Sequence, residues 1–317
     1  GRRIDYLRIA ITDRCNLRCR YCMPENGIDL ISHNDILSFE EFERLVKIFG
    51  NLGIKKVRIT GGEPLVRLGV FPFIRRIKSQ TKIETLCITT NGVRTARYLD
   101  KLSEIELDGI NLSLDTLRRD RFQQITRRDE FDAVWETFQK TIALKIPLKI
   151  NAVIQNGFNT DEIIPMAKLA ENNPIDVRFI EEMPFNGHGV FSDKPFSQHQ
   201  ILDQLQTTFP KMKKNDHHST AVCYQIPDFA GTIGIIGAYS RSFCGSCNRI
   251  RITPTGMLKT CLYDGGVLNL KTMLRNGASD EELVRAIHNT IQNRNKDGFV
   301  SESKNIKKID SMAKIGG

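Results

Sequence analysis

Residues 6–22, YLRIAITDRCNLRCRYC, join an alternating strand-like segment to three closely spaced cysteines. Side chains alternate between the two faces of a β-strand, so Arg8 and Thr12 share one face of this segment, whereas Leu7 and Ile9 share the other. The sequence therefore predicts a strand with one polar and one apolar face. The cysteines follow it on a loop.

The same pattern recurs along the first part of the chain. Strand-like segments are expected at 56–60, 85–90, 109–115, 147–154 and 176–183. Amphipathic stretches separate them, and one of these, 38–52, opens with Ser38 and Glu41 in a capping-box pattern. Strands that alternate with helices favour parallel βα units, and six units are fewer than the eight of a complete barrel.

The predicted fold is therefore α/β: an incomplete (β/α)6 TIM-like barrel followed by a C-terminal α+β extension. This extension contains Cys244, Cys247 and Cys261, the second group of cysteines and the expected site of a second cluster. The expected domains are 1–190 and 191–317. In the extension, 231–239 and 248–262 resemble a hairpin, and 267–294 resembles two helices.

The polar faces of the predicted strands are rich in cations. Helices would cover the outer, apolar faces, so the interior would be a polar cavity lined by basic side chains: Arg8, Lys56, Arg58, Lys149 and Arg178. Thr89 belongs to the same polar set. Unpaired buried charges cost several kcal/mol each, which favours a bound polyanion. The alternative is a solvent-exposed antiparallel face, where such alternation is common.

The amino-acid composition is also consistent with an anionic ligand but does not identify it. The 317 residues include 46 Lys plus Arg against 37 Asp plus Glu, which gives a formal net charge of +9. This excess suggests an anionic partner, and a nucleotide, a nucleic acid and a simple contribution to solubility all stay open. No apolar run is long enough to span a bilayer, and GRRIDYL lacks the features of a secretory signal. We therefore expect a cytoplasmic location and no membrane partner.

Six of the eight cysteines form two trios, Cys15, Cys19, Cys22 and Cys244, Cys247, Cys261. In a reducing compartment such clusters indicate metal binding rather than disulfides. Structural zinc takes four ligands, whereas three thiolates leave one iron of a [4Fe–4S] cube open to a ligand. For the second trio zinc stays possible, with Cys223, His217 or His218 as the fourth ligand. Cys87 and Cys223 otherwise fit plain buried thiols.

CNLRCRYC and the segment TGGEP at 60–64 together resemble the radical S-adenosylmethionine superfamily. In that superfamily the open iron of the first cluster binds S-adenosylmethionine, which is cleaved to an adenosyl radical. The resemblance implies a set of cofactor-binding residues: Tyr21, Gly62, Ser113 and Met183.

The second trio, with TTNG at 89–92 and the ending IGG, extends the resemblance over essentially the whole chain, to the GTP 3′,8-cyclase family of molybdenum cofactor biosynthesis. That family makes (8S)-3′,8-cyclo-7,8-dihydroguanosine 5′-triphosphate from GTP and uses two [4Fe–4S] clusters. The resemblance implies contacts to GTP from Arg8, Arg58, Thr89, Lys149, Arg249, Ile250 and Arg251, with Lys56 and Arg178 as supporting cations of the substrate site. No catalytic side chain beyond the clusters is expected, although Gly316 and Gly317 would reach into the active site.

The implied partners are GTP, a one-electron donor protein and the next enzyme of the pathway, cyclic pyranopterin monophosphate synthase. No nucleic-acid partner is expected, and a homodimer is left open. Two alternatives remain at this point. One is a radical S-adenosylmethionine enzyme with an auxiliary cluster that acts on a peptide or RNA. The other is a non-enzymatic zinc-binding module.

Overall fold

The computed structural model describes residues 2–187, 194–215, 220–305 and 310–316. The six predicted strands all form, and each lies parallel to its neighbours in chain order. Their bounds are Tyr6–Ala10 (β1), Lys56–Thr60 (β2), Thr85–Thr90 (β3), Gly109–Ser113 (β4), Leu148–Ile154 (β5) and Asp176–Glu181 (β6). The predicted partial barrel is confirmed.

Two strands from residues 191–317 pair with the two edges of this six-stranded parallel sheet. Thr232–Ile236 (β9) pairs in parallel with β6, and Arg249–Ile252 (β10) pairs in parallel with β1. The expected hairpin between 231–239 and 248–262 is therefore wrong, because the two segments lie at opposite edges. Each one satisfies the backbone N–H and C=O groups that an edge strand would leave unpaired.

Four short antiparallel strands complete the sheet. Its order is β12-β11-β10-β1-β2-β3-β4-β5-β6-β9-β8-β7. The short strands are Lys213–Asn215 (β7), Val222–Gln225 (β8), Met257–Lys259 (β11) and Leu268–Asn269 (β12). The hairpin that does form in the C-terminal part joins β10 to β11.

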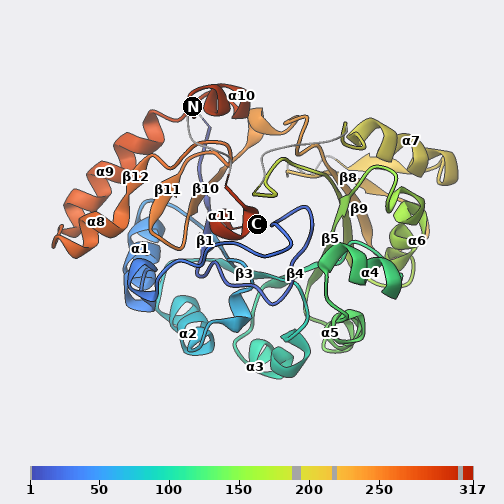
Figure 1. The fold of residues 1–317 in the computed structure, drawn as a ribbon, viewed down its shortest axis with the longest axis horizontal. Coiled ribbons are helices and arrows are strands. Elements are labelled where there is room, and N and C mark those ends of the chain that lie inside the picture. The colour runs from blue at the N-terminus through green and yellow to red at the C-terminus, as the bar shows by residue number, and fades with distance from the viewer. Residues whose placement is uncertain (1, 188–193, 216–219, 306–309, 317) are drawn as a thin grey trace.

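The sheet is curved, and helices cover its outer, convex side (Figure 1). The helices between the strands are Phe39–Asn51 (α1), Val70–Gln80 (α2), Leu99–Glu104 (α3), Arg119–Thr126 (α4), Phe131–Ala143 (α5) and Ile163–Ala167 (α6). As expected, Ser38 caps α1 in a complete capping box with Glu41. The apolar strand residues, such as Leu7, Val57 and Ile150, are fully buried beneath these helices.

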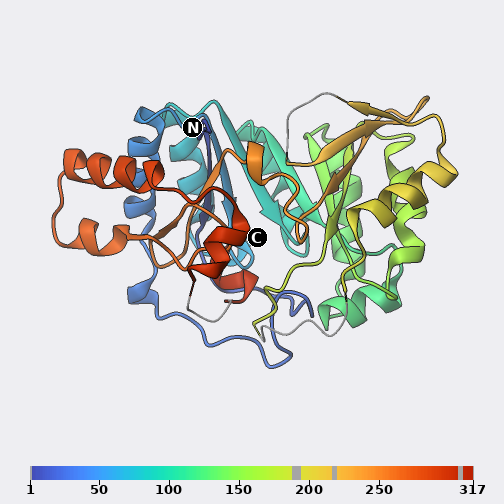
Figure 2. The ribbon, with the colours of Figure 1, turned by 90° about the horizontal axis from the view of Figure 1, so that it is seen from above.

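The remaining helices flank the sheet edges and its concave side. They are Gln198–Thr208 (α7), Leu270–Arg275 (α8), Asp280–Gln292 (α9), Gly298–Ser303 (α10) and Met312–Ile315 (α11). Helices α8 and α9 confirm the two helices expected in 267–294. They lie beside the β12 edge and α7 lies beside the other, as Figures 1 and 2 both show. Short α11 and the last described residue lie inside the curve of the sheet.

Within the described ranges, every helix is too short or too polar to cross a membrane.

Candidate active site

The first cysteine loop follows the carboxyl end of β1 and is anchored to α4. The backbone N–H groups of Arg18 and Arg20 donate to carbonyls at the end of α4, each at 2.9 Å. Within the loop, the N–H of Cys22 donates to the carbonyl of Cys19 at 2.9 Å. These contacts place Cys15, Cys19 and Cys22 on one tight turn at the carboxyl ends of the strands.

At Gly62 the TGGEP segment lies in close contact with the start of this loop. Its N–H donates to the carbonyl of Thr12 at 2.7 Å. A Cβ atom at position 62 would lie 2.4 Å from the carbonyl oxygen of Arg14, which directly precedes Cys15. Glycine is needed here because two backbone segments approach each other closely.

Glu63 connects TGGEP to TTNG and, through it, to the first trio. Its carboxylate accepts hydrogen bonds from the N–H of Asn91 at 2.7 Å and the hydroxyl of Thr90 at 2.9 Å. The amide of Asn91 then donates to the sulfur of Cys15 at 3.6 Å. Burial raises the pKa of Glu63 to about 7. Glu63 and Asn91 therefore position Cys15, a role that the sequence motifs alone did not reveal.

Tyr21 reaches from the loop to the carboxyl end of β4. Its hydroxyl donates to the carboxylate of Asp115 at 2.8 Å, and the other oxygen of Asp115 accepts from the N–H of Val153 at 2.8 Å. Burial raises the pKa of Asp115 to about 6 and raises that of Tyr21 well above its usual value. Tyr21 is thus half-buried and held in place next to Cys22 and two residues from Cys19.

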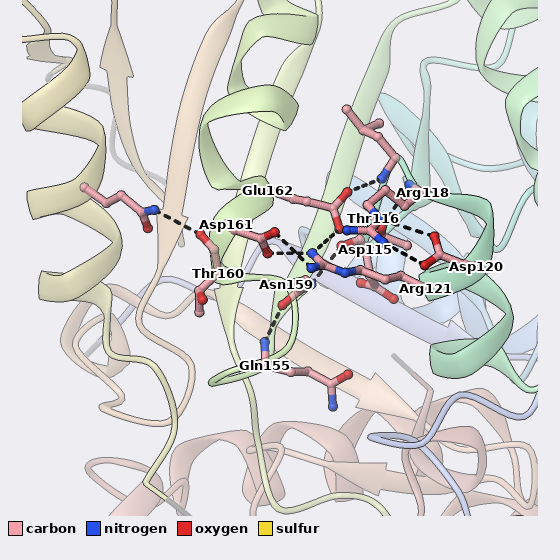
Figure 3. A network of polar contacts seen from close by, with 12 residues as sticks. Asp115, Thr116, Arg118, Asp120, Arg121, Gln155, Asn159, Thr160, Asp161 and Glu162 are labelled. Carbon is pink, nitrogen blue, oxygen red and sulfur yellow. Dashed lines mark hydrogen bonds and ion pairs between the residues drawn. The ribbon is translucent and has the colours of Figure 1, made fainter.

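A polar network behind Asp115 fixes the segments that follow β4 and β5 (Figure 3). The amide of Asn159 donates to the carbonyl of Asp115 at 2.8 Å, and Glu162 accepts from the hydroxyl of Thr116 at 2.6 Å. Arg121 binds both Glu162 and Asp161. The contact of Tyr21 with Asp115 therefore rests on a rigid support.

The other two predicted cofactor residues lie at the same end of the sheet. Ser113 is the last residue of β4, half-buried on the polar face, with Asn151 opposite it in the register. Met183 follows β6 and packs with Cys261 against a small buried cluster formed by Phe185, Tyr263 and Ile315. Met183 therefore lies against the segment that carries the second cysteine trio.

The protein environment of Cys15, Cys19 and Cys22 disfavours the ionised thiolate form. Burial and Glu63 raise the pKa of Cys15 to about 11, and burial and Cys15 raise that of Cys22 to about 12. Burial, Asp115 and the other two thiols also raise the pKa of Cys19 well above its usual value. Bound metal ions would lower these pKa values, because coordination to a metal deprotonates thiols. Three thiolates are the ligand number that would leave one iron of a [4Fe–4S] cube open.

The second trio is arranged at the amino end of β10. Cys244 and Cys247 precede this strand, and Cys261 follows β11, which runs antiparallel to it. Burial raises the pKa of Cys247, but Arg249 and Arg294 outweigh it and lower the value to about 7. A thiolate is thus favoured here, which fits a metal ligand. The two trios lie at opposite ends of the same concave sheet face.

Neither trio forms a preformed cage, because no group of three or more His, Cys, Asp and Glu side chains has metal-site geometry in the described part of the chain. For the zinc alternative, Cys223 lies in β8, at the far edge of the sheet from β10. His217 and His218 lie outside the described residues. Cys87 is buried, as expected, but on the concave face opposite Arg58.

The predicted cations form rows across the concave face. Arg251 of β10, Arg8 of β1 and Arg58 of β2 occupy one register row. Burial and Arg251 lower the pKa of Arg8 well below its usual value, and burial and Arg249 lower that of Arg251 to about 10. Clustered buried guanidinium groups repel one another, so a bound anion would stabilise this row.

Several buried polar atoms on this face lack a hydrogen-bond partner among the described residues: Oγ1 of Thr60, Oγ1 of Thr89, Oδ1 of Asn151 and Nε of Arg249. Buried polar groups are normally paired, so this concentration indicates a ligand site. At the amino ends of the strands, a cavity of about 280 Å³ is lined in part by Lys56, Arg58 and Lys149.

Lys149 and Arg178 share a carboxylate that the sequence analysis did not select. Asp176 accepts from Nζ of Lys149 at 2.8 Å and from Nε of Arg178 at 2.8 Å. Asp176 begins β6 with its side chain on the concave face, directly opposite Lys149. Its position two residues before Arg178 was the available signal, since alternation places both on one face.

Ile250 differs from the other predicted substrate residues. Its side chain is fully buried in the apolar core, opposite Leu7 in the register, whereas Arg249 and Arg251 lie on the concave face. Any contact of Ile250 with a ligand in the concavity is therefore through its backbone.

The C-terminal segment enters the concave face. The carbonyl of Gly316 accepts a hydrogen bond from Arg251 at 2.7 Å, and the hydroxyl of Ser311 donates to the carbonyl of Cys22 at 2.6 Å. Gly316 has φ +88°, and a Cβ there would lie 2.6 Å from the Cβ of Ala10. Only glycine fits this position without strain. Gly317 lies outside the described residues.

Comparisons with known proteins agree with this architecture. The family model described as the Radical SAM superfamily matches residues 9–170, and the model described as Molybdenum Cofactor Synthesis C matches residues 175–300. Among solved structures, SuiB of Streptococcus suis bound to S-adenosylmethionine has a TM-score of 0.64, covering 95% of this chain and 68% of that chain. Its sequence identity is 14%, so this likeness shows the fold alone.

Relatives by sequence are much closer. A GTP 3′,8-cyclase from Heliobacterium modesticaldum is 43% identical over 301 residues, which cover 92% of this chain and 91% of that protein. Molybdenum cofactor biosynthesis protein 1 of Bos taurus is 44% identical over 290 residues, which cover 90% of this chain and 46% of that protein. By these matches the chain belongs to the GTP 3′,8-cyclase family of the radical S-adenosylmethionine superfamily.

Proposed function

We propose that this chain converts GTP to (8S)-3′,8-cyclo-7,8-dihydroguanosine 5′-triphosphate, the first step of molybdenum cofactor biosynthesis, with two [4Fe–4S] clusters and S-adenosylmethionine. The supporting observation is the concave sheet face, where cations and unsatisfied buried polar atoms gather between two cysteine trios. A nucleoside triphosphate supplies the negative charge and the hydrogen-bond partners that such a face requires.

The two trios would hold the two clusters. Cys15, Cys19 and Cys22 would bind the first, and Cys244, Cys247 and Cys261 the second. S-adenosylmethionine would lie beside the first cluster, next to Tyr21, Gly62, Ser113 and Met183. When bound, the first cluster and S-adenosylmethionine supply the radical that takes a hydrogen atom from the ribose of GTP.

The cations of the concave face would hold the triphosphate and the ribose. Arginine suits this role because its planar guanidinium makes two parallel hydrogen bonds to phosphate oxygens. Candidate contacts are Arg8, Lys56, Arg58, Thr89, Lys149, Arg178, Arg249 and Arg251, with Ile250 through its backbone. Their task is positioning, since a displacement of about 1 Å can cost of order a hundredfold in rate.

The C-terminal segment would complete the site. Gly316 lies against Arg251 and Ala10, and Ser311 binds the first cysteine loop. We infer that this segment excludes water from the concavity and contacts the bound GTP. Gly317 would follow Gly316 into the same space.

A nucleotide substrate suits this site better than the alternatives of a peptide or RNA. The cations lie on strand interiors, on the same face as buried polar atoms that lack a hydrogen-bond partner among the described residues. An RNA-binding protein would instead present a basic stripe on an outer surface. Identity of 43% to a GTP 3′,8-cyclase over nine tenths of the chain points to the same substrate class. The one-electron donor protein and cyclic pyranopterin monophosphate synthase remain proposed partners on the strength of the family.

The decisive experiment is anaerobic incubation of the reconstituted protein with GTP, S-adenosylmethionine and a reductant. The expected product is the 3′,8-cyclised nucleotide, identified by mass and NMR. S-adenosylmethionine cleavage without a GTP-derived product would contradict the proposal.

Iron and sulfide analysis of anaerobically purified variants tests the clusters separately. Cys244→Ser should lose the iron and sulfide of one cube, and Cys15→Ser those of the other. Cys223→Ser is the matched control and should keep both. Zinc without sulfide in the wild type, together with loss of that zinc in Cys223→Ser, would favour the zinc alternative.

A further inference from the structure

We propose that Tyr6 is a positioning residue for the substrate phosphates: its hydroxyl holds the guanidinium of Arg58, and binding of GTP is coupled to uptake of a proton by Tyr6. This inference rests on the proposed function, since it takes GTP as the occupant of the concave face. The contacts expected from the sequence do not include Tyr6.

Tyr6 lies within the cation rows. It begins β1, two residues before Arg8 on the same face, and its register partners are Lys56 on β2 and Arg249 on β10. Alternation along β1 was therefore sufficient to place its phenol on the concave face.

Its hydroxyl has a specific partner. Nε of Arg58 donates to the hydroxyl oxygen of Tyr6 at 2.5 Å, and a terminal nitrogen of Arg58 donates to the carbonyl of Ile88 at 3.3 Å. The ammonium of Lys56 lies 5.3 Å from the centre of the Tyr6 ring, in reach of a cation–π interaction. Arg58 itself is only 3% exposed. Tyr6 thus sets the plane of a buried guanidinium that faces the concavity.

The surroundings of the phenol are strongly cationic. The charged and titratable groups that face it are Arg8 on β1, Lys56 and Arg58 on β2, Cys87 on β3, and Arg249 and Arg251 on β10. Burial raises the pKa of Tyr6, but Arg58 and Arg8 outweigh it and lower the value to about 8. The phenol would therefore ionise about two pH units earlier than an ordinary tyrosine of pKa about 10.

A bound triphosphate changes this balance. Its negative charge would neutralise the same cations that stabilise the phenolate, so the pKa of Tyr6 would rise on binding. The ligand complex would then bind more protons than the free enzyme above a pH of about 8. By linkage, the affinity for GTP should fall as the pH rises through about 8, by at most about tenfold per pH unit for one proton. Below that pH, Tyr6 is protonated in both states and adds no pH dependence.

The test compares wild type with Tyr6→Phe, both reconstituted anaerobically. Calorimetric titration with GTP at pH about 7 and about 9 gives the affinities, and buffers of different ionisation heat give the proton uptake. The wild type should lose several-fold more affinity than Tyr6→Phe between these two values. At the higher pH it should also take up more protons than the variant, because any uptake by Arg8 and Arg251, whose pKa values are lowered, is common to both proteins. Tyr98→Phe, which removes a hydroxyl near Phe71 outside the concavity, is the matched control and should behave as wild type.

Ultraviolet titration of the GTP-free protein provides an independent check. One of the six tyrosines should ionise near pH 8, and this step should be missing in Tyr6→Phe and shifted upward by GTP. If Tyr6→Phe binds GTP with the same pH dependence and proton uptake as wild type, the proposal is wrong. If the wild type binds no GTP at all, the proposed function fails instead, and the two failures are therefore distinguishable.

Discussion

Arg294 donates a hydrogen bond to the sulfur of Cys247 at 3.3 Å, and another to the carbonyl of the same residue at 2.9 Å. Arg2 donates to the carbonyl of Cys244 in the same loop at 2.5 Å, and to the carbonyl of Asn295, next to Arg294, at 2.8 Å. The second cysteine loop is thus held by two arginines. Arginines also bind backbone carbonyls of the first loop, but there the sulfur of Cys15 accepts a hydrogen bond from the neutral amide of Asn91.

This contrast predicts the effect of Arg294→Gln. The reduction potential of an iron–sulfur cluster depends on the hydrogen bonds to its sulfurs and on nearby charge. A cationic donor favours the reduced, more negative cluster, so the variant should lower the potential of the second cluster and leave that of the first unchanged. A redox titration monitored by electron paramagnetic resonance measures both. Arg285→Gln, on the exposed side of α9, is the control, and an unchanged second potential in Arg294→Gln would contradict the prediction.

Gly62→Ala should detach the first cysteine loop. The new Cβ would lie 2.4 Å from the carbonyl oxygen of Arg14, and backbone at that distance has to move. We expect loss of the first cluster with retention of the second, measured as iron and sulfide content. Gly50→Ala, in helix α1 with ordinary contacts at 3.7 Å, should keep both clusters. Full cluster content in Gly62→Ala would show that this close approach is dispensable.

Asp176→Asn should reduce stability in a pH-dependent way. Burial raises the pKa of Asp176, but Arg178 and Lys149 outweigh it and lower the value. The ion pairs therefore stabilise the fold at pH values above the unfolded pKa of about 4, and this contribution is lost as the pH falls through the lowered folded value.

At pH near 7 the free energy of unfolding of Asp176→Asn should fall by about 1–3 kcal/mol. The difference from wild type should shrink below pH about 4. Urea denaturation of the apoprotein across this range measures it. Asp120→Asn, which breaks an exposed pair with Arg118, should change stability by less than about 0.5 kcal/mol. A pH-independent loss in Asp176→Asn would be evidence against the ion pairs as its cause.

Gly316→Ala should displace the C-terminal segment from the concave face. Its Cβ would meet the Cβ of Ala10 at 2.6 Å and the hydroxyl of Thr60 at 2.7 Å. We expect cyclisation of GTP to fall by roughly a hundredfold, while cluster content and S-adenosylmethionine cleavage stay largely intact. Gly277→Ala has a similar φ of +80° but no atom within 4 Å, so it separates backbone strain from the contact. Equal cyclase activity in both variants would show that the contacts of Gly316 have no role in the mechanism.

Local rules were sufficient for the elements of the barrel and for most of its concave face. Alternation within each strand placed Arg8, Arg58 and Lys149 on one face, and the structure brings them to that face. The capping box at Ser38 began α1 as predicted. Such signals succeed because strand pleat and helix capping depend only on neighbouring residues.

Contacts between distant segments were decided by the tertiary structure alone. The sequence did not show that β9 and β10 would occupy opposite edges of the parallel run, because edge pairing depends on which backbone groups remain unsatisfied after the barrel has formed. Nor did it show that Asp176 pairs with Lys149, or that Arg58 binds Tyr6, since those contacts require strands far apart in the chain to lie in one register. Residue types and strand faces are local properties, whereas the partner of a buried charge depends on the completed sheet.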